Sequence, residues 1–428
     1  MSDDNGRFRR RTFIKATAAG AGTAGFAGCL GDDDDDADDG DDTAPADDSD
    51  DGDDGDDGEL DVDEIIVGGL QPYTGPFALY GEAHTLGIEY AFDEINANGG
   101  VLGAELVHDP VDTESDPSEA VTILTEKVEQ DDIIAAVGPV SSDVGVNVAP
   151  EAEMLEVPIF MHAAGDLQVL TRDSRYTFRT ALPPAPTFIE SVYEEVQERG
   201  YTEVGAIVGD YAWGHGAEIA IEEFFGDDIT YELAPVGEDD FAPYLRDMPD
   251  GLEVLVGSGH PPGLNDMFSD MLELDMDVEM FTAAVSPPEA NYNALGDDVQ
   301  HGFTFGHLAD YYSDEYQDIA HEFNEETGEF FGPSQAAAYV TGYVIAEAIE
   351  AAGVHDRSAV ADEIRNIELD TIYAEPLQYT EWGEIDQFSL IWSQFELEAP
   401  DHYPDGDFDL AEEFRTPVLD GVDPEEYQ

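Results

Sequence analysis

The stretch Ile65-Ile66-Val67-Gly68-Gly69-Leu70-Gln71-Pro72-Tyr73-Thr74-Gly75-Pro76-Phe77-Ala78-Leu79-Tyr80-Gly81 begins with an apolar run and continues into a loop rich in proline and glycine. The apolar run has the length and residue types of a buried strand. From Leu86 to Ile95 apolar residues recur on one face of a helix, and Asn98-Gly99-Gly100 ends that helix. A strand, a loop and a helix in this order predict the first unit of an α/β sheet.

Strand and helix patterns alternate along the rest of the chain, and the alternation starts again after the prolines of residues 183–186. Repetition of strand, helix and strand at this spacing implies parallel sheets with helices on both faces. The sequence therefore predicts an α/β fold with two doubly wound parallel-sheet lobes. The expected later elements are strands at 105–107, 133–137, 204–208, 254–256 and 388–395, and helices at 118–129, 187–199, 216–225, 264–274 and 333–352.

Several linked motifs resemble the branched-chain amino acid, amide and urea binding proteins of ABC importers. The resemblance begins with residues 69–81 and with Asp93-Glu94-Ile95-Asn96-Ala97-Asn98-Gly99-Gly100-Val101-Leu102-Gly103. Further matches, in the family's order, are Ser115-Asp116-Pro117, Gly138-Pro139-Val140-Ser141-Ser142, Val157-Pro158-Ile159, Tyr176-Thr177-Phe178-Arg179-Thr180 and Gly302-Phe303. The resemblance implies a type I periplasmic-binding-protein fold, in which a three-segment hinge joins two lobes and a ligand cleft lies between them.

The lobes of that fold exchange chain segments, so the resemblance also implies where each lobe lies in the sequence. We expect lobe one at residues 64–182 plus 308–351, and lobe two at residues 183–307 plus 352–395. Residues 396–428 are expected to form an acidic, loosely ordered tail.

The ligand site should lie in the loops at the carboxyl ends of the strands, as in open α/β sheets generally. The hydroxyls of Ser141 and Ser142, with the N–H groups that follow, would bind a carboxylate or carbonyl group. Helix capping is the competing explanation for serine there. The resemblance adds Tyr80, with Tyr73, Gln71 and Phe77 as weaker candidates. It also adds the loop residues Ala163, Ala164, Gly165 and Asp166 from lobe one, and Asp210, Trp213, Gly259, His260 and Val285 from lobe two, where Trp213 would cover the ligand.

Three of these positions depart from the amino-acid-binding members of the family. Gly165 stands where they tend to have threonine, Gly259 replaces a tyrosine, and Val285 falls where they usually keep a carboxylate for the ligand ammonium. A buried ammonium without a counter-charge would cost several kcal/mol. Either Asp166 or Asp210 supplies that charge, or the ligand is an amide, a urea-like compound or a small carboxylic acid.

The N-terminal 63 residues predict an export signal, an anchor and a tether. Residues 1–28 resemble a twin-arginine lipoprotein signal, with Arg10 and Arg11 ahead of a stretch of mostly alanine and glycine. Cys29, the only cysteine, stands where a lipobox has its lipid-modified residue. Residues 29–63 form an acidic tether that cannot bury enough apolar surface to fold. We therefore expect a lipid-anchored protein at the outer face of the cytoplasmic membrane.

The charge balance is strongly acidic: 101 Asp and Glu stand against 14 Lys and Arg, which gives a formal net charge of −87 at pH 7. Such a charge destabilises a compact chain through self-repulsion at low salt, whereas about 1 M salt shortens the Debye length to about 3 Å and screens it. The chain resembles haloarchaeal proteins. Because phosphate binding needs a basic patch, we expect no nucleic acid partner.

Sequence signals of common enzyme classes are missing. Residues 257–263 lack the dinucleotide-binding spacing, no P-loop lysine is present, Ser141 and Ser142 lack a nucleophile elbow, and the histidines lack metal-ligand spacing. We therefore expect a non-enzymatic binding protein without cofactor or metal, whose partners are a small-molecule ligand and an ABC permease. A lipoprotein that presents its ligand to a sensory transducer is the alternative, which the sequence leaves open.

Overall fold

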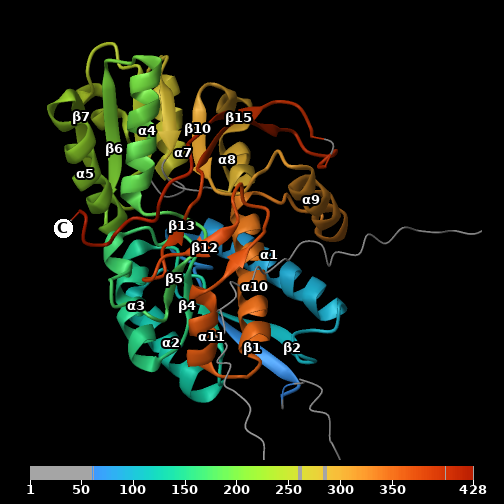
Figure 1. Cartoon of the computed structure of the whole chain (residues 1–428). Helices are drawn as coiled ribbons and strands as arrows, with labels where there is room; N and C mark the ends of the chain where they lie inside the picture. The colour runs from blue at the N-terminus through green and yellow to red at the C-terminus, as the bar shows by residue number, and fades with distance from the viewer. Residues whose placement is uncertain (1–59, 61, 259–262, 283–286, 401, 428) are drawn as a thin grey trace, which may run out of the picture.

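The computed structural model describes residues 60, 62–258, 263–282, 287–400 and 402–427. These residues form two lobes, one below the other in Figure 1. The predicted α/β fold with two parallel-sheet lobes is confirmed. The predicted signal, including Arg10 and Arg11, the anchor residue Cys29 and nearly all of the acidic tether lie outside the described residues.

Lobe one contains a five-stranded sheet in the order β2-β1-β3-β4-β5, in which every neighbouring pair is parallel. Helices α1 and α10 pack against each other on one face of the sheet, and α2 and α3 cover the other. The bounds are β1 (Glu64–Gln71), β2 (Glu105–Asp112), β3 (Ala135–Val137), β4 (Ile159–Met161), β5 (Thr177–Arg179), α1 (Ala78–Ala97), α2 (Pro117–Gln130), α3 (Ser142–Leu155) and α10 (Pro333–Ala352).

Lobe two contains a seven-stranded sheet in the order β15-β14-β10-β9-β8-β6-β7. The five strands from β10 to β7 are parallel, and β14 and β15 add an antiparallel edge. The bounds are β6 (Val204–Asp210), β7 (Ile229–Pro235), β8 (Val254–Ser258), β9 (Glu279–Thr282), β10 (Phe303–His307), β14 (Ile391–Glu396), β15 (Asp409–Arg415), α4 (Ala185–Arg199), α5 (Ala212–Phe224), α6 (Ala242–Asp247), α7 (Gly263–Glu273) and α8 (Pro288–Leu295).

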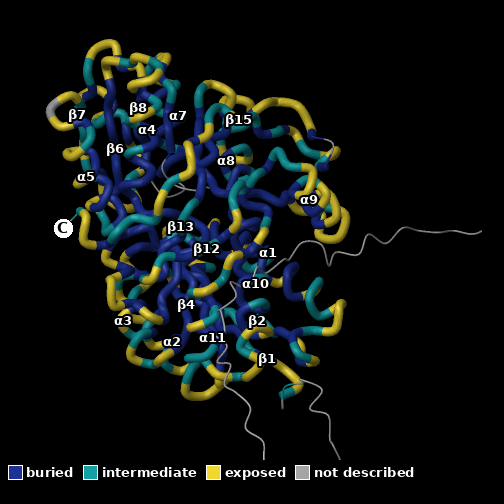
Figure 2. Tube along the Cα trace, viewed as in Figure 1, coloured by how far each residue is buried: buried dark blue, intermediate teal, exposed yellow. Residues whose placement is uncertain are grey.

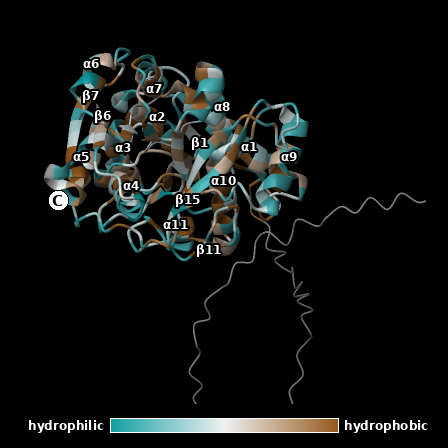
Figure 3. Cartoon of the chain, turned by 90° about the horizontal axis from the view of Figure 1, so that it is seen from above, coloured by the Kyte–Doolittle hydropathy of each residue, from teal (hydrophilic) through white to brown (hydrophobic). Residues whose placement is uncertain are grey.

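The remaining elements are short or lie beside the lobes. They are η2 (Leu167–Val169), η3 (Gly226–Asp228), η4 (Gly296–Gln300), α9 (Asp314–Thr327), α11 (Arg357–Arg365), β11 (Glu368–Leu369), β12 (Leu377–Tyr379) and β13 (Ile385–Asp386). Figure 2 shows buried residues along the strands of each lobe and exposed residues on the outer loops. In Figure 3 the outlying helix α9 carries mostly hydrophilic residues, as expected for a helix at the margin of the molecule.

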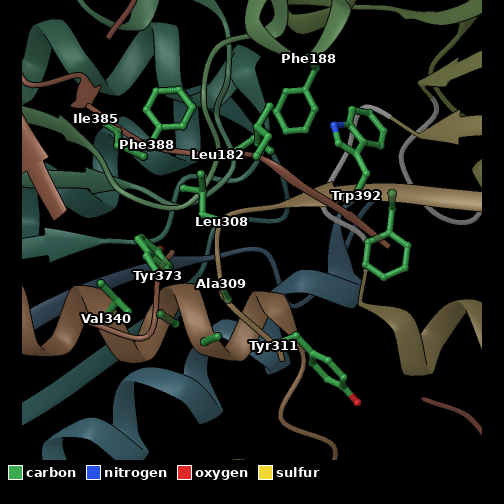
Figure 4. Packing of buried hydrophobic residues seen from close by; sticks show 14 of the residues in the cluster. Leu182, Phe188, Leu308, Ala309, Tyr311, Val340, Tyr373, Ile385, Phe388 and Trp392 are labelled. Carbon is green, nitrogen blue, oxygen red and sulfur yellow. The ribbon is translucent and has the colours of Figure 1, made fainter. Parts of the chain in front are cut away.

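The chain passes between the lobes in three segments, at 180–184, 308–313 and 387–390. The hydroxyl of Tyr373 donates a hydrogen bond to the carbonyl oxygen of Thr180 at 2.9 Å, and Ala309 and Tyr373 form an antiparallel bridge. Leu182, Leu308 and Phe388, one from each segment, lie close together in Figure 4. The three connecting segments therefore lie together, and hydrogen bonds and apolar packing hold this region.

The expected lobe boundary at 352–395 is wrong for its first half. Helix α11 packs on α10 of lobe one, and Arg357 donates to the carbonyl oxygen of Ile133 at 2.7 Å. The small sheet of β11, β12 and β13 also lies beside lobe one, where the ring of Tyr379 packs edge-on against Phe178. In this region only β14 pairs with the lobe-two sheet. The alternation of helix and strand patterns in the sequence predicts the order of these elements. It does not show which of the two lobes each element packs against.

The expectation of a loosely ordered tail at 396–428 is wrong as well. Strand β15 pairs with β14, and the ring of Phe414 stacks on Trp392 with centroids 5.4 Å apart. Farther along, Arg172 of lobe one forms ion pairs with Asp423 and Glu425. The acidic composition of this segment concealed an edge strand in which Leu410 is buried.

Two predicted helices begin at least four residues earlier in the structure than in the sequence analysis. Helix α1 begins at Ala78 rather than Leu86, and α5 begins at Ala212 rather than 216. Glycine lowers helix propensity, so Gly81 concealed the first turns of α1. A Cβ at Gly81 would lie 2.5 Å from the carbonyl oxygen of Pro72, so glycine serves close packing there. This shift brings Tyr80 into the first turn of α1.

Candidate ligand-binding site

The carboxyl ends of both parallel sheets lie at the interface between the lobes. In lobe one, β1, β3 and β4 lead into loops at 72–77, 138–141 and 162–166, and in lobe two β6 leads almost directly into α5. Open parallel sheets bind ligands at this edge. The predicted site residues Gly259, His260 and Val285 lie outside the described residues.

Residues of both lobes meet here in an apolar group, which we call the cross-lobe aromatic cluster. Phe77, Tyr80 and Val140 of lobe one are its buried members, and Ala163 and Tyr211 pack against them. Tyr211 belongs to lobe two, and its ring centroid lies 6.0 Å from that of Phe77. Burial is the main reason why the pKa of the Tyr211 phenol is raised, so this hydroxyl stays neutral. Tyr80 and Phe77 were predicted at the site, whereas Tyr211 was missed.

The two predicted serines have different environments. Ser141 is the N-cap residue of α3, yet its side chain makes no capping hydrogen bond. Helix capping therefore does not explain this serine. The hydroxyl oxygen of Ser142 accepts a hydrogen bond from the backbone N–H of Asp166 at 3.2 Å, which ties the start of α3 to the 162–166 loop. The hydroxyl of Ser142 thus holds the loop, whereas no capping hydrogen bond engages the hydroxyl of Ser141.

The 162–166 loop packs closely against lobe two. Ala164 and Gly165 are buried, and Ala163 is half-buried. A Cβ at Gly165 would lie 2.9 Å from atoms Cδ1 and Nε1 of the Trp213 indole, and Trp213 is only 2% exposed. The indole thus occupies the space that a larger residue at position 165 would need. This contact gives a physical reason for glycine in place of threonine.

The two predicted acids differ in burial. Asp166 is 3% exposed, and its Oδ1 accepts a hydrogen bond from the N–H of Gln168 at 2.8 Å. Burial raises the pKa of the Asp166 carboxyl. The carboxylate of Asp210 is 56% exposed and pairs with His215 at 2.8 Å. Asp166 is therefore the acid that lies at the buried part of the lobe interface.

One hydrogen bond joins the first turn of α3 to the first turn of α5 across the interface. Oδ1 of Asp143 accepts it from the backbone N–H of Ala212 at 3.1 Å. A carboxylate is favourable at this position because the N-terminus of α5 carries partial positive charge. The contact stabilises the arrangement in which the lobes touch.

Replacing Asp143 by alanine should weaken ligand binding about two- to tenfold, because an intramolecular hydrogen bond contributes a net free energy of about 0.5–1.5 kcal/mol. Isothermal titration with any ligand of the protein measures this change, and the melting temperature should move little. Asp173→Ala, at an exposed position of lobe one, is the matched control. Equal affinities in both variants would contradict a role for Asp143 in closing the lobes.

Two buried histidines near the site were missed. His84 lies one helical turn after Tyr80 in α1, and the ring centroids of these residues are 6.1 Å apart. His162 directly follows β4, and its ring lies 4.5 Å from that of His84. The spacing of four residues between Tyr80 and His84 places both on one face of a helix. The sequence could have shown that Tyr80 and His84 share a face if α1 had been predicted to begin at Ala78.

A search of the described residues finds no group of three or more His, Cys, Asp or Glu that could hold a metal ion. Among the same residues, no helix combines the length and the apolar character that crossing a membrane requires.

Comparison with known proteins identifies relatives over most of the folded part. The model of the family described as periplasmic binding protein matches residues 64–388. The Leu/Ile/Val-binding protein BraC3 of Rhizobium johnstonii is 40% identical over 86 residues, which cover 20% of this chain and 23% of that protein. Leu/Ile/Val-binding protein homolog 6 of Brucella abortus is 26% identical over 314 residues, covering 70% of this chain and 80% of that protein. The match therefore spans less than a quarter of BraC3 and most of the second relative.

Solved structures share the fold at low sequence identity. The leucine-binding protein LivK of Thermotoga maritima has a TM-score of 0.70 at 19% identity, covering 82% of this chain and 99% of that chain. A solute-binding protein of an ABC transporter from R. palustris, in complex with benzoate, has a TM-score of 0.70 at 17% identity, covering 83% and 98%. The predicted type I periplasmic-binding-protein fold is thus confirmed. On the family match over residues 64–388, the chain belongs to the periplasmic binding protein family.

Proposed function

We propose that this protein is the extracytoplasmic solute-binding component of an ABC importer. It captures a small ligand between its two lobes and delivers it to a membrane permease. The observation that supports this most directly is the cross-lobe aromatic cluster, in which Phe77 and Tyr80 of lobe one meet Tyr211 of lobe two at the edge where parallel sheets bind ligands. The names of its relatives, Leu/Ile/Val-binding proteins, agree with such a role.

The mechanism is capture without chemistry. The hydroxyl of Ser141 and the first N–H groups of α3 bind the polar part of the ligand, since a helix N-terminus presents unpaired donors. The aromatic cluster surrounds the apolar part, and the contacts of Trp213 with Gly165 and of Asp143 with Ala212 hold the lobes together. Tyr80, Ala163, Ala164 and Asp166 complete the lobe-one side, and Gly259, His260 and Val285 belong to the lobe-two side of this proposed site.

A thermal-shift screen of the full chain in multimolar KCl tests the function. The panel contains branched-chain and aromatic amino acids, amides, urea and small carboxylates. A ligand at about 100 times its dissociation constant should raise the free energy of unfolding by roughly 2.7 kcal/mol. A clear shift with one class supports the proposal. Silence across the whole panel would contradict it and favour presentation of another ligand to a sensory transducer.

Cys29 should anchor the protein to the outer face of the cytoplasmic membrane after twin-arginine export. We expect Cys29→Ser to release the protein into the medium with its ligand affinity unchanged, because the acidic tether separates the anchor from the folded lobes. Fractionation of cells and medium measures the release. Replacing Arg10 and Arg11 by lysines should instead keep the protein inside the cell. Retention of the serine variant at the membrane would exclude lipid anchoring through this residue.

A further inference from the structure

The last described segment of the chain, residues 416–427, lies along the junction of the two lobes, and we call it the C-terminal strap. It begins where β15 of lobe two ends, and it pairs with the third hinge segment, 387–390. The N–H of Leu419 donates to the carbonyl oxygen of Phe388 at 2.7 Å, and the N–H of Phe388 donates back at 3.1 Å. The family match ends at residue 388, so the strap lies beyond it. In Figure 1 the strap runs toward the end marked C, at the level where the lobes meet.

The middle of the strap is fixed to lobe one. The N–H of Gly421 donates to Oδ1 of Asp386 at 2.7 Å, and Nε1 of Trp382 donates to the carbonyl oxygen of Val422 at 3.1 Å. Trp382 itself packs against the lobe-one core. A Cβ at Gly421 would lie 2.6 Å from the carbonyl oxygen of Ile385, so the strap lies directly on the small sheet beside lobe one.

Arg172 of lobe one adds charge pairing next to these hydrogen bonds. Its Nε donates to Oδ1 of Asp423 at 3.0 Å, and its guanidinium lies 3.0 Å from a carboxylate oxygen of Glu425. Arg172 is 53% exposed, so each ion pair alone contributes little. Pro424, between the two acids, is buried. The backbone hydrogen bonds, the buried proline and the ion pairs together form the lobe-one attachment of the strap.

Two residues farther on, the strap contacts lobe two. The ring centroid of Tyr427 lies 6.5 Å from that of Phe224, the last residue of α5. Glu426 and Tyr427 also line a surface hollow of about 500 Å³ with residues of α4 and α5, which are Glu190, Ile219, Glu223 and Phe224. These contacts form the lobe-two attachment of the strap.

Helix α5 also meets lobe one at its other end. Its first residue, Ala212, donates the hydrogen bond to Asp143 that crosses the lobe interface. The next residue is Trp213, whose indole lies against Gly165 of lobe one. The strap therefore holds the far end of the same helix whose first turn touches lobe one at the proposed ligand site.

The lobe-two attachment lies among like charges. Burial, followed by Glu190, Glu426 and Glu223, raises the pKa of Tyr427 to about 12. Glu426 also acts electrostatically on Glu190. Among the described residues that line the hollow there is no Lys or Arg. The Debye length is about 3 Å at 1 M salt and about 10 Å at 0.1 M, so this repulsion is screened in high salt and grows as the salt concentration falls.

The two attachments cannot both persist when the lobes move far apart. Only Glu426 stands between Glu425, at the lobe-one ion pair, and Tyr427, and two residues of extended chain span at most about 7 Å. A wide separation of α5 from lobe one at this place therefore detaches one end of the strap. The lobe-two end detaches first, because an aromatic contact among like charges opposes hydrogen bonds and ion pairs at the lobe-one end.

We propose that the C-terminal strap limits the opening of the two lobes. With Tyr427 on α5 the ligand-free protein stays near the arrangement in which the lobes touch, and detachment of Tyr427 lets the lobes open widely. The inference rests on the proposed function, because it describes the regulation of the ligand site between the lobes. A ligand binds more tightly when the arrangement that it favours is already populated, so the strap favours tight capture in high salt.

Pulsed electron double resonance measures the opening directly and without a ligand. The parent protein is the full chain with Cys29→Ser, spin-labelled at Glu82→Cys in α1 of lobe one and at Asp239→Cys before α6 of lobe two, which are exposed positions. In multimolar KCl we expect one short distance between the labels. Tyr427→Ala should raise the ratio of long to short distances about two- to tenfold, the range that an aromatic contact contributes.

Two further variants complete the test. Val418→Ala changes a strap residue that is 50% exposed, and it should leave the distances of the parent protein unchanged. Glu426→Gln removes one of the like charges at the lobe-two attachment. It should keep the short distance at a KCl concentration at which the parent protein already shows the long one. Thermal unfolding of each variant shows whether it is folded.

The outcomes separate this inference from the proposed function. If folded Tyr427→Ala kept the distances of the parent protein, or if Glu426→Gln kept its dependence on salt, the inference would be overturned. The solute-binding function would stand, because no ligand takes part in the measurement. If Tyr427→Ala opened the lobes while every compound of the thermal-shift screen was silent, the proposed function would fail, and the strap would limit the opening of a protein with another role.

Discussion

Replacing Arg179 by methionine should lower the free energy of unfolding by about 3–5 kcal/mol, the cost of leaving one partner of a buried ion pair without its counter-charge. Nε of Arg179 donates to both carboxylate oxygens of Glu384, at 3.0 and 2.9 Å. The two side chains are 1% and 3% exposed. Without the guanidinium, Glu384 keeps a buried carboxyl whose pKa burial already raises. Chemical denaturation in multimolar KCl measures the loss.

The double variant Arg179→Met/Glu384→Leu separates charge pairing from positioning. Replacing a buried ion pair by apolar residues is often neutral, so most of the lost stability should return. The guanidinium also donates to the carbonyl oxygens of Ala164 and Asp166, and those bonds stay lost. We therefore expect fast hydrogen exchange in the 162–166 loop and weak ligand binding to persist in the double variant.

A neighbouring exposed ion pair supplies the control. Arg175 is 51% exposed and pairs with Asp362, which is 54% exposed. Arg175→Met should cost less than about 1 kcal/mol, as exposed pairs usually do. A double variant as unstable as Arg179→Met alone would show that the unpaired carboxyl of Glu384 is not the cause of the instability.

The fold could be predicted because its signals are local and repeated. The run Ile65-Ile66-Val67 is buried or half-buried in β1, and the apolar face from Leu86 to Ile95 lies in α1. What the sequence concealed depends on contacts between distant segments. Helix α11 joins lobe one through Arg357 and Ile133, which lie more than two hundred residues apart. No local pattern contains such a pairing.

The site was predictable to the extent that family motifs mark it. Tyr80, Ser141 and Trp213 come from quoted motifs, and the structure places all three near the lobe interface. Their roles as ligand contacts stay predictions. His84 and His162 escaped notice because a histidine beside apolar residues is usually a satisfied core residue. Only the three-dimensional arrangement shows that, within the described part of the chain, Nδ1 of His84 and both ring nitrogens of His162 lack hydrogen-bond partners.

Acid should destabilise the protein through His84. Burial lowers the pKa of this histidine to about 3 in the folded state, against an ordinary value of 6.5. At a pH between these two values the unfolded chain binds a proton at His84 that the folded chain does not bind. The contribution of neutral His84 to the free energy of unfolding is therefore complete above pH 6.5 and is lost as the pH falls. From pH 7.5 to pH 4.5 the loss should be about 2–3 kcal/mol, since one pKa unit corresponds to about 1.36 kcal/mol.

The effect is measured as the difference in the free energy of unfolding between the wild type and His84→Gln. The glutamine side chain of this variant stays neutral over the whole pH range. Burial raises the pKa of Glu289 and of Glu347 to about 7, and these carboxyls act in the opposite direction, because the folded state then binds the extra proton. Both carboxyls are present in both proteins, so their contribution cancels in the comparison. His321→Gln, at a side chain 47% exposed on α9, is the control and should follow the wild type. If the wild type and His84→Gln lost stability in parallel between pH 7.5 and 4.5, His84 would have to accept its proton within the folded protein.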